Sequence, residues 1–379
     1  MMNRGCSVVR NFIFRRCGPA SLAAIAVLAA SSLKAQTFDP SVTVGAGIRT
    51  SFDHTDPTVG SSLDQFALND ARIYLSGTVT KNIGVMFNTD YDQASNTMQI
   101  LDAVGQIDLA PQAHFWFGRF LPPSDRANLY GPFYANEWAV YSDGIQDGYT
   151  FVFQGRDDGL AYWGDFKAGI AKIKVSVGAF DGGSSTHGAD NRIITAARVQ
   201  IDFWDPENGY YLNGTYYGDK NLLAIGGATQ DQAGKTASTV DFLMERKVMG
   251  GGAFTIESEF SRYNRLGGYT SDIGEESKYR SEGAYILASF LIPKQVGIGK
   301  FEGLGKYAEA DFTGGLGGPG VNPSFRQKTS EFDFSYIMKQ FDARLMAFGE
   351  NTSYSGTGAP KEFWQAGLGL QLQISKSIH

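Results

Sequence analysis

The chain has 379 residues, of which 42% are hydrophobic and 19% are charged, and its formal net charge at pH 7 is −6. Its aromatic content of 13% is too high for a disordered chain, and its 47 glycines follow no collagen-like period. A polytopic helical membrane protein is excluded, because the only long apolar run, Leu22 to Ala30, lies near the N-terminus. No later stretch approaches the roughly 18 apolar residues of a spanning helix.

Residues 1–35 have the composition of a secretory signal peptide. Four arginines precede the apolar run, and Leu33-Lys34-Ala35 ends in a small residue that suits cleavage. Both cysteines, Cys6 and Cys17, lie in this segment, so we expect a mature chain without thiols or disulfides. The segment carries five positive charges and no acidic residue, so its removal changes the net charge from −6 to −11, which disfavours nucleic-acid binding. The alternative is that the apolar run is a buried helix of the fold.

The rest of the chain, residues 36–379, alternates apolar and polar residues in one segment after another, which predicts β-strands. Clear examples are Ala71–Thr80, Gly252–Asn264 and Glu362–Ser375. Many segments are longer than the usual strand of about 5–6 residues. They match the roughly 9–11 residues with which a tilted strand crosses a bilayer. We count about 16 candidate strands, with 18 as the upper estimate.

The two faces of these strands indicate a membrane barrel. The polar faces are rich in Gly, Ser, Thr, Asn, Gln and Asp, with scattered Lys and Arg, which suits the wall of a water-filled lumen, and the apolar faces then contact lipid. Aromatic pairs such as Tyr210-Tyr211, Tyr216-Tyr217 and Phe363-Trp364 fit interfacial girdles. An open sheet edge cannot be satisfied in lipid, so the sheet must close. The sequence therefore predicts an all-β protein, a single closed antiparallel transmembrane barrel wide enough for a channel.

Four short stretches stand out within residues 70–183, namely Ala71-Arg72-Ile73-Tyr74-Leu75-Ser76-Gly77, Phe117-Gly118-Arg119-Phe120-Leu121-Pro122-Pro123, Arg156-Asp157-Asp158-Gly159-Leu160 and Val175-Ser176-Val177-Gly178-Ala179-Phe180-Asp181-Gly182. They resemble motifs of the phosphate-selective porin O/P family of Gram-negative outer-membrane porins. The resemblance implies a homotrimeric, 16-stranded porin in the bacterial outer membrane, reached through the periplasm. It also implies an inward-folded loop that narrows the pore, and small solutes or inorganic anions, phosphate among them, as cargo.

The last predicted strand carries a second resemblance. Residues Gln365–Leu372, in the pattern Gln365-x-Gly367-x-x-Leu370-x-Leu372, are similar to the C-terminal strand signal that the barrel assembly machinery reads. That signal usually ends in an aromatic residue at the chain terminus, whereas this chain ends in His379. The resemblance implies the assembly machinery as a partner and leaves the role of the last residue open.

Residues 121–147 form the longest stretch without clean alternation, and we expect them to be the constriction loop. Pro122, Pro123 and Pro132 would not be tolerated in the middle of a transmembrane strand. The alternative is a long extracellular loop that lies on top of the barrel.

Charged rings at the narrowest point select ions in a pore. The candidate loop is mostly acidic, since it carries one arginine and four carboxylates, the last of them Asp147. This balance argues mildly against strong phosphate selectivity. Each charge could instead be a solvated loop residue or a wall residue far from the constriction. The residues that we expect to line the constriction are Arg119, Arg126, Glu137, Asp143 and Arg156.

The sequence gives little support for catalysis, a metal or a cofactor. The histidines at 54, 114, 187 and 379 have no second histidine or cysteine at i+2 or i+4, there is no Gly-x-Ser-x-Gly elbow, and Gly315-x-Gly317-x-x-Gly320 precedes no helix. We therefore predict a passive diffusion porin that is not an enzyme and uses no cofactor. Two alternatives are a structural or adhesive barrel without an open channel, and a barrel-embedded hydrolase that pairs a serine with His114 or His187.

Overall fold

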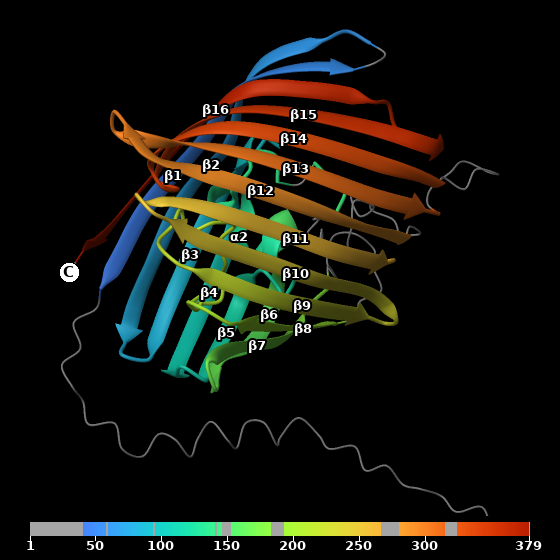
Figure 1. Cartoon of the computed structure of the whole chain (residues 1–379). Coiled ribbons are helices and arrows are strands. Elements are labelled where there is room, and N and C mark those ends of the chain that lie inside the picture. The colour runs from blue at the N-terminus through green and yellow to red at the C-terminus, as the bar shows by residue number, and fades with distance from the viewer. Residues whose placement is uncertain are drawn as a thin grey trace, which may run out of the picture. The chain divides into compact units, whose positions relative to one another are not determined.

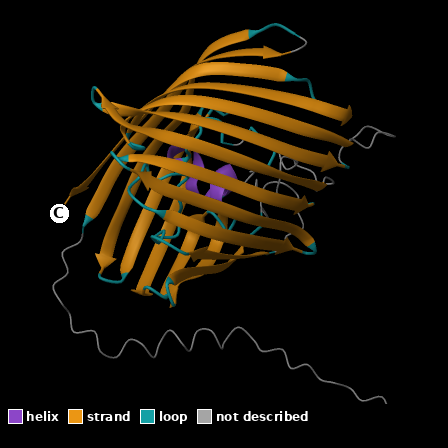
Figure 2. Ribbon diagram, in the orientation of Figure 1, coloured by secondary structure: helices purple, strands orange, loops and turns teal. Residues whose placement is uncertain are grey.

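Within the described part of the chain, sixteen strands pair in sequence order, and the first strand pairs with the last to close an antiparallel barrel (Figures 1 and 2). The computed structural model describes residues 41–57, 60–93, 95–140, 142–145, 153–182, 193–266, 280–314 and 324–378. The predicted signal peptide, Asp147, His187, His379 and the glycine-rich loop at 315–320 lie outside these residues. The closed antiparallel barrel is confirmed, with 16 strands rather than 18.

The elements follow the chain without crossovers. The strands are β1 (Val42–Pro57), β2 (Leu63–Thr80), β3 (Ile83–Asp92), β4 (Thr97–Ala110), β5 (Ala113–Phe120), β6 (Asp157–Ala168), β7 (Ala171–Phe180), β8 (Ile194–Asp202), β9 (Leu222–Gln232), β10 (Lys235–Val248), β11 (Gly252–Asn264), β12 (Arg280–Val296), β13 (Gly299–Thr313), β14 (Ser324–Lys339), β15 (Ala343–Thr357) and β16 (Phe363–Ile378). A helix, α2 (Arg126–Tyr134), and one 3-10 turn, η1 (Phe153–Gly155), lie between β5 and β6.

The alternation along most strands separates an exposed apolar outer face from a buried inner face. The inner face is largely polar, except on β5 to β8, where inward-facing side chains such as Trp116 form an apolar cluster. In β12, Ile286 and Phe290 are exposed on the outside, whereas Tyr285 and Ser289 are buried inside. Most other strands also expose large apolar side chains on the outside of the barrel, which is the reverse of the arrangement in a soluble protein. Exposed apolar surface of this extent marks a face that contacts lipid or another protein.

The connections differ between the two ends of the barrel. At one end, six connections have only two or three residues, such as 81–82 and 340–342, and the described chain also starts and stops there, where Val42 pairs with Ile378. We call this the short-turn end. The connection between β8 and β9, residues 203–221, is the exception at this end. At the opposite end, the connection from β5 to β6 spans residues 121–156 and contains both helical elements.

Helix α2 is short and interrupted. Asp125 caps its first turn by accepting a hydrogen bond from the backbone amide of Asn128, and Gly131, with φ +61° and ψ 177°, breaks the helix before Pro132. Figure 2 shows the helix within the ring of strands. No helix in the described residues is long and apolar enough to cross a membrane.

The register of β4 against β5 depends on a glycine. Gly118 has φ +123°, and a Cβ at this position would lie 2.1 Å from the carbonyl oxygen of Ala103. We therefore expect Gly118→Ala to lower the free energy of unfolding by about 1–3 kcal/mol. Urea titration of the detergent-folded protein measures this loss. A Cβ at Gly303 meets no described atom within 4 Å, so Gly303→Ala serves as the control and should leave the midpoint unchanged. Equal midpoints for both variants would contradict the register.

Candidate functional site

Among the described residues, two long connecting segments lie in the interior of the barrel, and they enter from opposite ends. We call residues 121–145 the loop-end segment, described except at position 141, and residues 203–221 the turn-end segment. They meet along α2, where the amide of Leu212 donates to the carbonyl of Leu129 (3.1 Å) and the amide of Gly214 donates to that of Tyr134 (2.9 Å). The Tyr210 hydroxyl also donates to the carbonyl of Leu121 (2.8 Å).

A buried ion cluster ties both segments to the barrel wall. The Arg126 guanidinium on α2 binds both oxygens of Glu207 on the turn-end segment, at 3.0 and 2.6 Å. Its Nε lies 3.5 Å from Asp241 of β10, which also accepts from Arg198 of β8. Burial alone would raise the pKa of the Glu207 carboxyl, yet the Arg126 guanidinium holds that pKa below its usual value. The bidentate geometry compensates the desolvation of these charges.

Asp125, the cap of α2, borders this cluster and is also buried. Its carboxylate accepts from the backbone amide of Asn128 at 2.8 Å and from the side-chain amide of Asn128 at 2.6 Å. Burial raises the pKa of the Asp125 carboxyl to about 6, despite these donors and with a further contribution from Asp241. The carboxylate form of the Asp125 side chain is therefore favoured only above about pH 6.

Carboxylates on the inner face of β10 to β15 hold the backbones of both segments. Glu331 accepts from the amide of Ala139 and Asp333 from the amide of Trp138, both at 2.9 Å. On the other segment, Glu245 accepts from the amides at 216 and 218, each at 2.7 Å. A carboxylate that accepts a backbone amide makes a charge-assisted hydrogen bond, so this acidic wall is an anchoring surface.

A second ion cluster anchors the far part of the loop-end segment. Lys306 of β13 lies 3.2 Å from Glu137 and 2.8 Å from Asp143. All three side chains are almost completely buried. Glu137 and Asp143 therefore bind the segment to the wall.

Aromatic side chains of the loop-end segment pack onto inward-facing glycines. A Cβ at Gly369 of β16 would lie 2.5 Å from the ring of Trp138, and a Cβ at Gly47 of β1 would lie 2.8 Å from Phe133. The Arg49 guanidinium sits 4.1 Å from the centroid of the Trp138 ring. The glycines thus leave the space that the segment needs.

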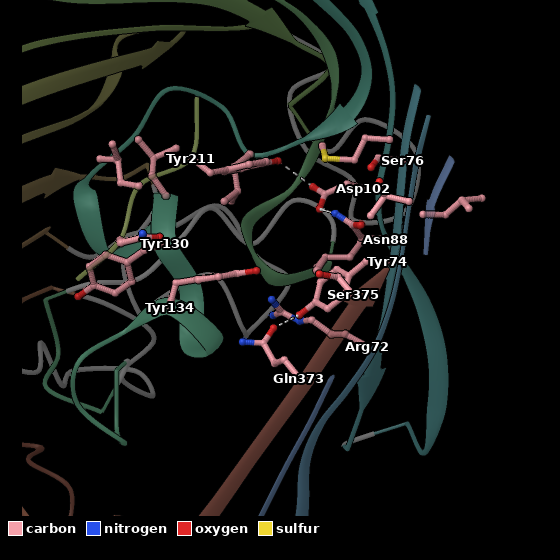
Figure 3. Close-up of a pocket in the computed structure, with 18 of the residues that line it drawn as sticks. Arg72, Tyr74, Ser76, Asn88, Asp102, Tyr130, Tyr134, Tyr211, Gln373 and Ser375 are labelled. Atoms are coloured by element: carbon pink, nitrogen blue, oxygen red, sulfur yellow. Dashed lines mark hydrogen bonds between the residues drawn. The ribbon is translucent and has the colours of Figure 1, made fainter. Parts of the chain in front are cut away.

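Between the described residues, the interior contains a cavity of about 340 Å³ against β1 to β4 and β16 (Figure 3). Its wall carries Arg72, whose Nε donates to Asp90 at 2.7 Å, and Asp102, which accepts from Asn88 at 2.9 Å. Tyr134 from α2 and Tyr211 from the turn-end segment project toward this wall in Figure 3. Tyr211 donates to Asp102 at 3.0 Å. The barrel wall and the two segments thus surround a space that is lined by polar and aromatic side chains. Asp342 of the 340–342 turn also lines it.

The five predicted constriction residues separate into three groups. Arg126, Glu137 and Asp143 lie in the interior but are buried and ion-paired, so they act as anchors. Arg156 lines the cavity, with its Nε 3.3 Å from Asp102. Arg119 does not face the interior. It lies on the outer row of β5, because Trp116 and Phe120 take the inward positions, and it pairs with Asp158 at 2.7 Å.

The sequence did not predict that the turn-end segment lies inside the barrel. The prediction that Tyr210-Tyr211 and Tyr216-Tyr217 belong to interfacial girdles is wrong, because these side chains are buried or half-buried in the interior. The available signal was the absence of alternation between residues 203 and 221 at the end where all other turns are short. The alternation of Ala71–Thr80 placed Arg72 on the polar face of its strand, but its position at the cavity required the three-dimensional register.

The fold is similar to that of solved outer-membrane proteins. An anion-selective porin from Comamonas acidovorans shares 14% identity over 89% of this chain and 100% of that one, with a TM-score of 0.55. OmpT of Vibrio cholerae shares 12% sequence identity over 90% of this chain and 99% of that one, with a TM-score of 0.53. OmpF of Salmonella typhi, solved in complex with daunomycin, shares 11% sequence identity over 88% of this chain and 97% of that one, with a TM-score of 0.53. Identities this low show the fold alone. No protein-family model and no curated protein matches the sequence, so the O/P resemblance stays a prediction.

The Arg126 cluster should dominate the stability of the interior. Arg126→Met leaves Glu207 and Asp241 buried beside a neutral side chain, so we expect the free energy of unfolding to fall by about 3–5 kcal/mol. Arg119→Met removes the same charge from the partly exposed pair on the outer row, which should cost at most about 1 kcal/mol. Urea unfolding of both detergent-folded variants compares the two. Equal losses would contradict the role of the buried cluster.

Proposed function

We propose that this protein is a porin of the bacterial outer membrane, through which small hydrophilic solutes and ions diffuse passively. The cavity against β1 to β4 and β16 carries this proposal, because it is polar space inside a barrel with an apolar outer face. A 16-stranded barrel has room for an aqueous channel. The fold similarity to an anion-selective porin is consistent with such a role.

The two inner segments define what kind of porin we propose. Their backbones are held by the acidic wall of β10 to β15, and the cavity among the described residues lies against β1 to β4 and β16. A cavity of about 340 Å³ favours small solutes and a small unit conductance. The constriction is then formed by both segments, and its wall includes Arg72 and Arg156.

The charges at the passage favour weak ion selectivity. Arg72 and Arg156 are balanced by Asp102 and Asp342 among the lining residues. Both arginines already contact carboxylates, at Asp90 and Asp102. We therefore propose a general small-solute passage in preference to a phosphate-specific one.

Assembly and location complete the proposal. The predicted signal peptide would direct export to the periplasm, and residues Gln365–Leu372, which lie on the closing strand β16, would bind the barrel assembly machinery. A homotrimer in outer-membrane lipid is proposed from the family resemblance. The hydrolase alternative gains no support at His114, whose Nδ1 lies 2.6 Å from Asp108 and whose ring stacks on Trp163. No serine among the described residues hydrogen-bonds to it.

Planar-bilayer recording tests the porin proposal. The wild-type protein should give small conductance steps and a reversal potential near zero in a KCl gradient. Tyr211→Ala removes a ring from the cavity and should raise the unit conductance about twofold, because the pore constriction limits conduction. Tyr162→Ala, on the outer row of β6, is the control and should leave the steps unchanged.

Two outcomes would contradict the proposal. Absence of steps from folded, heat-modifiable protein would favour a structural barrel without an open channel. A strong anion potential with block by phosphate would replace the general passage by an anion-specific one.

A further inference from the structure

The cavity combines hydrogen-bonding side chains with aromatic and aliphatic surface. Tyr74, Tyr134 and Tyr211 line it together with Asn88 and Gln373, as Figure 3 shows. Leucines at 129 and 212, one on each inner segment, also line it. Ligand pockets of this kind are mostly apolar and contain a few polar groups that orient the ligand.

The polar groups of the cavity are prearranged by contacts with one another. The Tyr74 hydroxyl donates to Oε1 of Gln373 at 3.0 Å, and the Gln373 side-chain amide donates to the carbonyl of Phe341 at 3.1 Å. Asn88 donates its amide to Asp102, which leaves its carbonyl oxygen as an acceptor. These bonds fix the donors and acceptors before a ligand arrives, which lowers the entropic cost of binding.

Tyr134 provides an uncommitted hydroxyl. It stands at the C-terminal end of α2, and Figure 3 shows its oxygen directed toward Arg72 and the wall. This hydroxyl has no hydrogen-bond partner among the described residues. The ring is held from behind by an edge contact with Phe341, at a centroid distance of 5.4 Å. A side chain held in place with an open donor and acceptor suits a ligand hydroxyl.

The charge at the cavity argues for a neutral ligand. The four charged lining residues are two arginines and two aspartates, and each arginine is already paired with a carboxylate, Arg72 with Asp90 and Arg156 with Asp102. An anion would have to compete with these carboxylates, and a cation would meet the guanidinium groups. A neutral solute avoids both costs.

We propose that this cavity binds a neutral polyhydroxylated solute of monosaccharide size as it crosses the barrel. The volume of about 340 Å³ corresponds to roughly eleven waters at ~30 Å³ each, which suits one sugar ring. The hydroxyl edge of such a ring meets Asn88, Gln373 and Tyr134, and its C–H face meets the tyrosine and leucine surface. This inference rests on the proposed porin function for the passage, but the binding itself is measurable without conduction.

Two measurements with three nearly isosteric probes test the proposal. D-glucose, D-glucuronate and D-glucosamine are all pyranoses that differ in charge and little in shape. Each is added to single channels in KCl, where binding appears as saturable block of the ion current. Each is also added to the detergent-folded full chain, where saturation-transfer-difference NMR reports binding independently of conduction. We expect glucose to saturate both signals at lower concentration than either charged analogue.

A conservative variant locates the site. Tyr134→Phe keeps the ring and removes one hydroxyl, so the apparent dissociation constant for glucose should rise about three- to tenfold. Tyr217→Phe is the matched control. Tyr217 lies on the turn-end segment, its hydroxyl is 3.3 Å from Arg344, and it does not line the cavity, so affinity should be unchanged.

The outcomes separate this inference from the porin proposal. Conductance in KCl without saturable block by glucose, or tighter block by glucuronate or inorganic phosphate, overturns the neutral-solute site and leaves the porin standing. A glucose NMR signal that is sensitive to Tyr134→Phe, in a protein without conductance, supports the site and overturns the porin. Absence of both signals overturns both. An equal loss of affinity in Tyr134→Phe and Tyr217→Phe overturns the assignment to this cavity.

Discussion

The interior of this barrel depends on the buried contact between Arg126, Glu207 and Asp241. A ring of 16 strands encloses more space than its own side chains can fill, so the chain inserts two segments of its own. Those segments come from opposite ends, and the Arg126 guanidinium joins both of them to the wall of β10. Charges this deeply buried are costly unless they are paired, which agrees with the bidentate geometry at Glu207.

The anchoring contacts also decide where space remains. Carboxylates of the β10 to β15 wall accept backbone amides from both segments, and Lys306 holds Glu137 and Asp143 against the same side. Both segments are thereby held against this wall, the loop-end segment also packs on β1 and β16, and the described cavity lies in the remaining space against β1 to β4 and β16. In this account the acidic residues of the loop-end segment position the constriction, and tyrosines, amides and paired arginines form its surface.

The sequence predicted the barrel because alternation is a local property that each strand repeats, as Ile286 and Tyr285 illustrate on β12. It also directed attention to residues 121–147. The sequence did not show which residues near a strand end face the interior. Arg119 lies on the outer face of β5, because Trp116 and Phe120 take the inward positions. Nor did the sequence place the turn-end segment, whose interior position follows from pairing between residues 81 positions apart, Arg126 and Glu207. Such pairings depend on the closed register and have no local signal.

Hydrogen exchange measured by mass spectrometry on the folded protein tests the central claim most directly, namely that residues 203–221 lie inside the barrel and are held there by hydrogen bonds. The amides at 212, 214, 216 and 218 all donate to described acceptors. If residues 203–221 are held inside the barrel, peptides that cover them should exchange as slowly as peptides of β8 and β9. Exchange as fast as that of the exposed turn at 340–342 would contradict that claim.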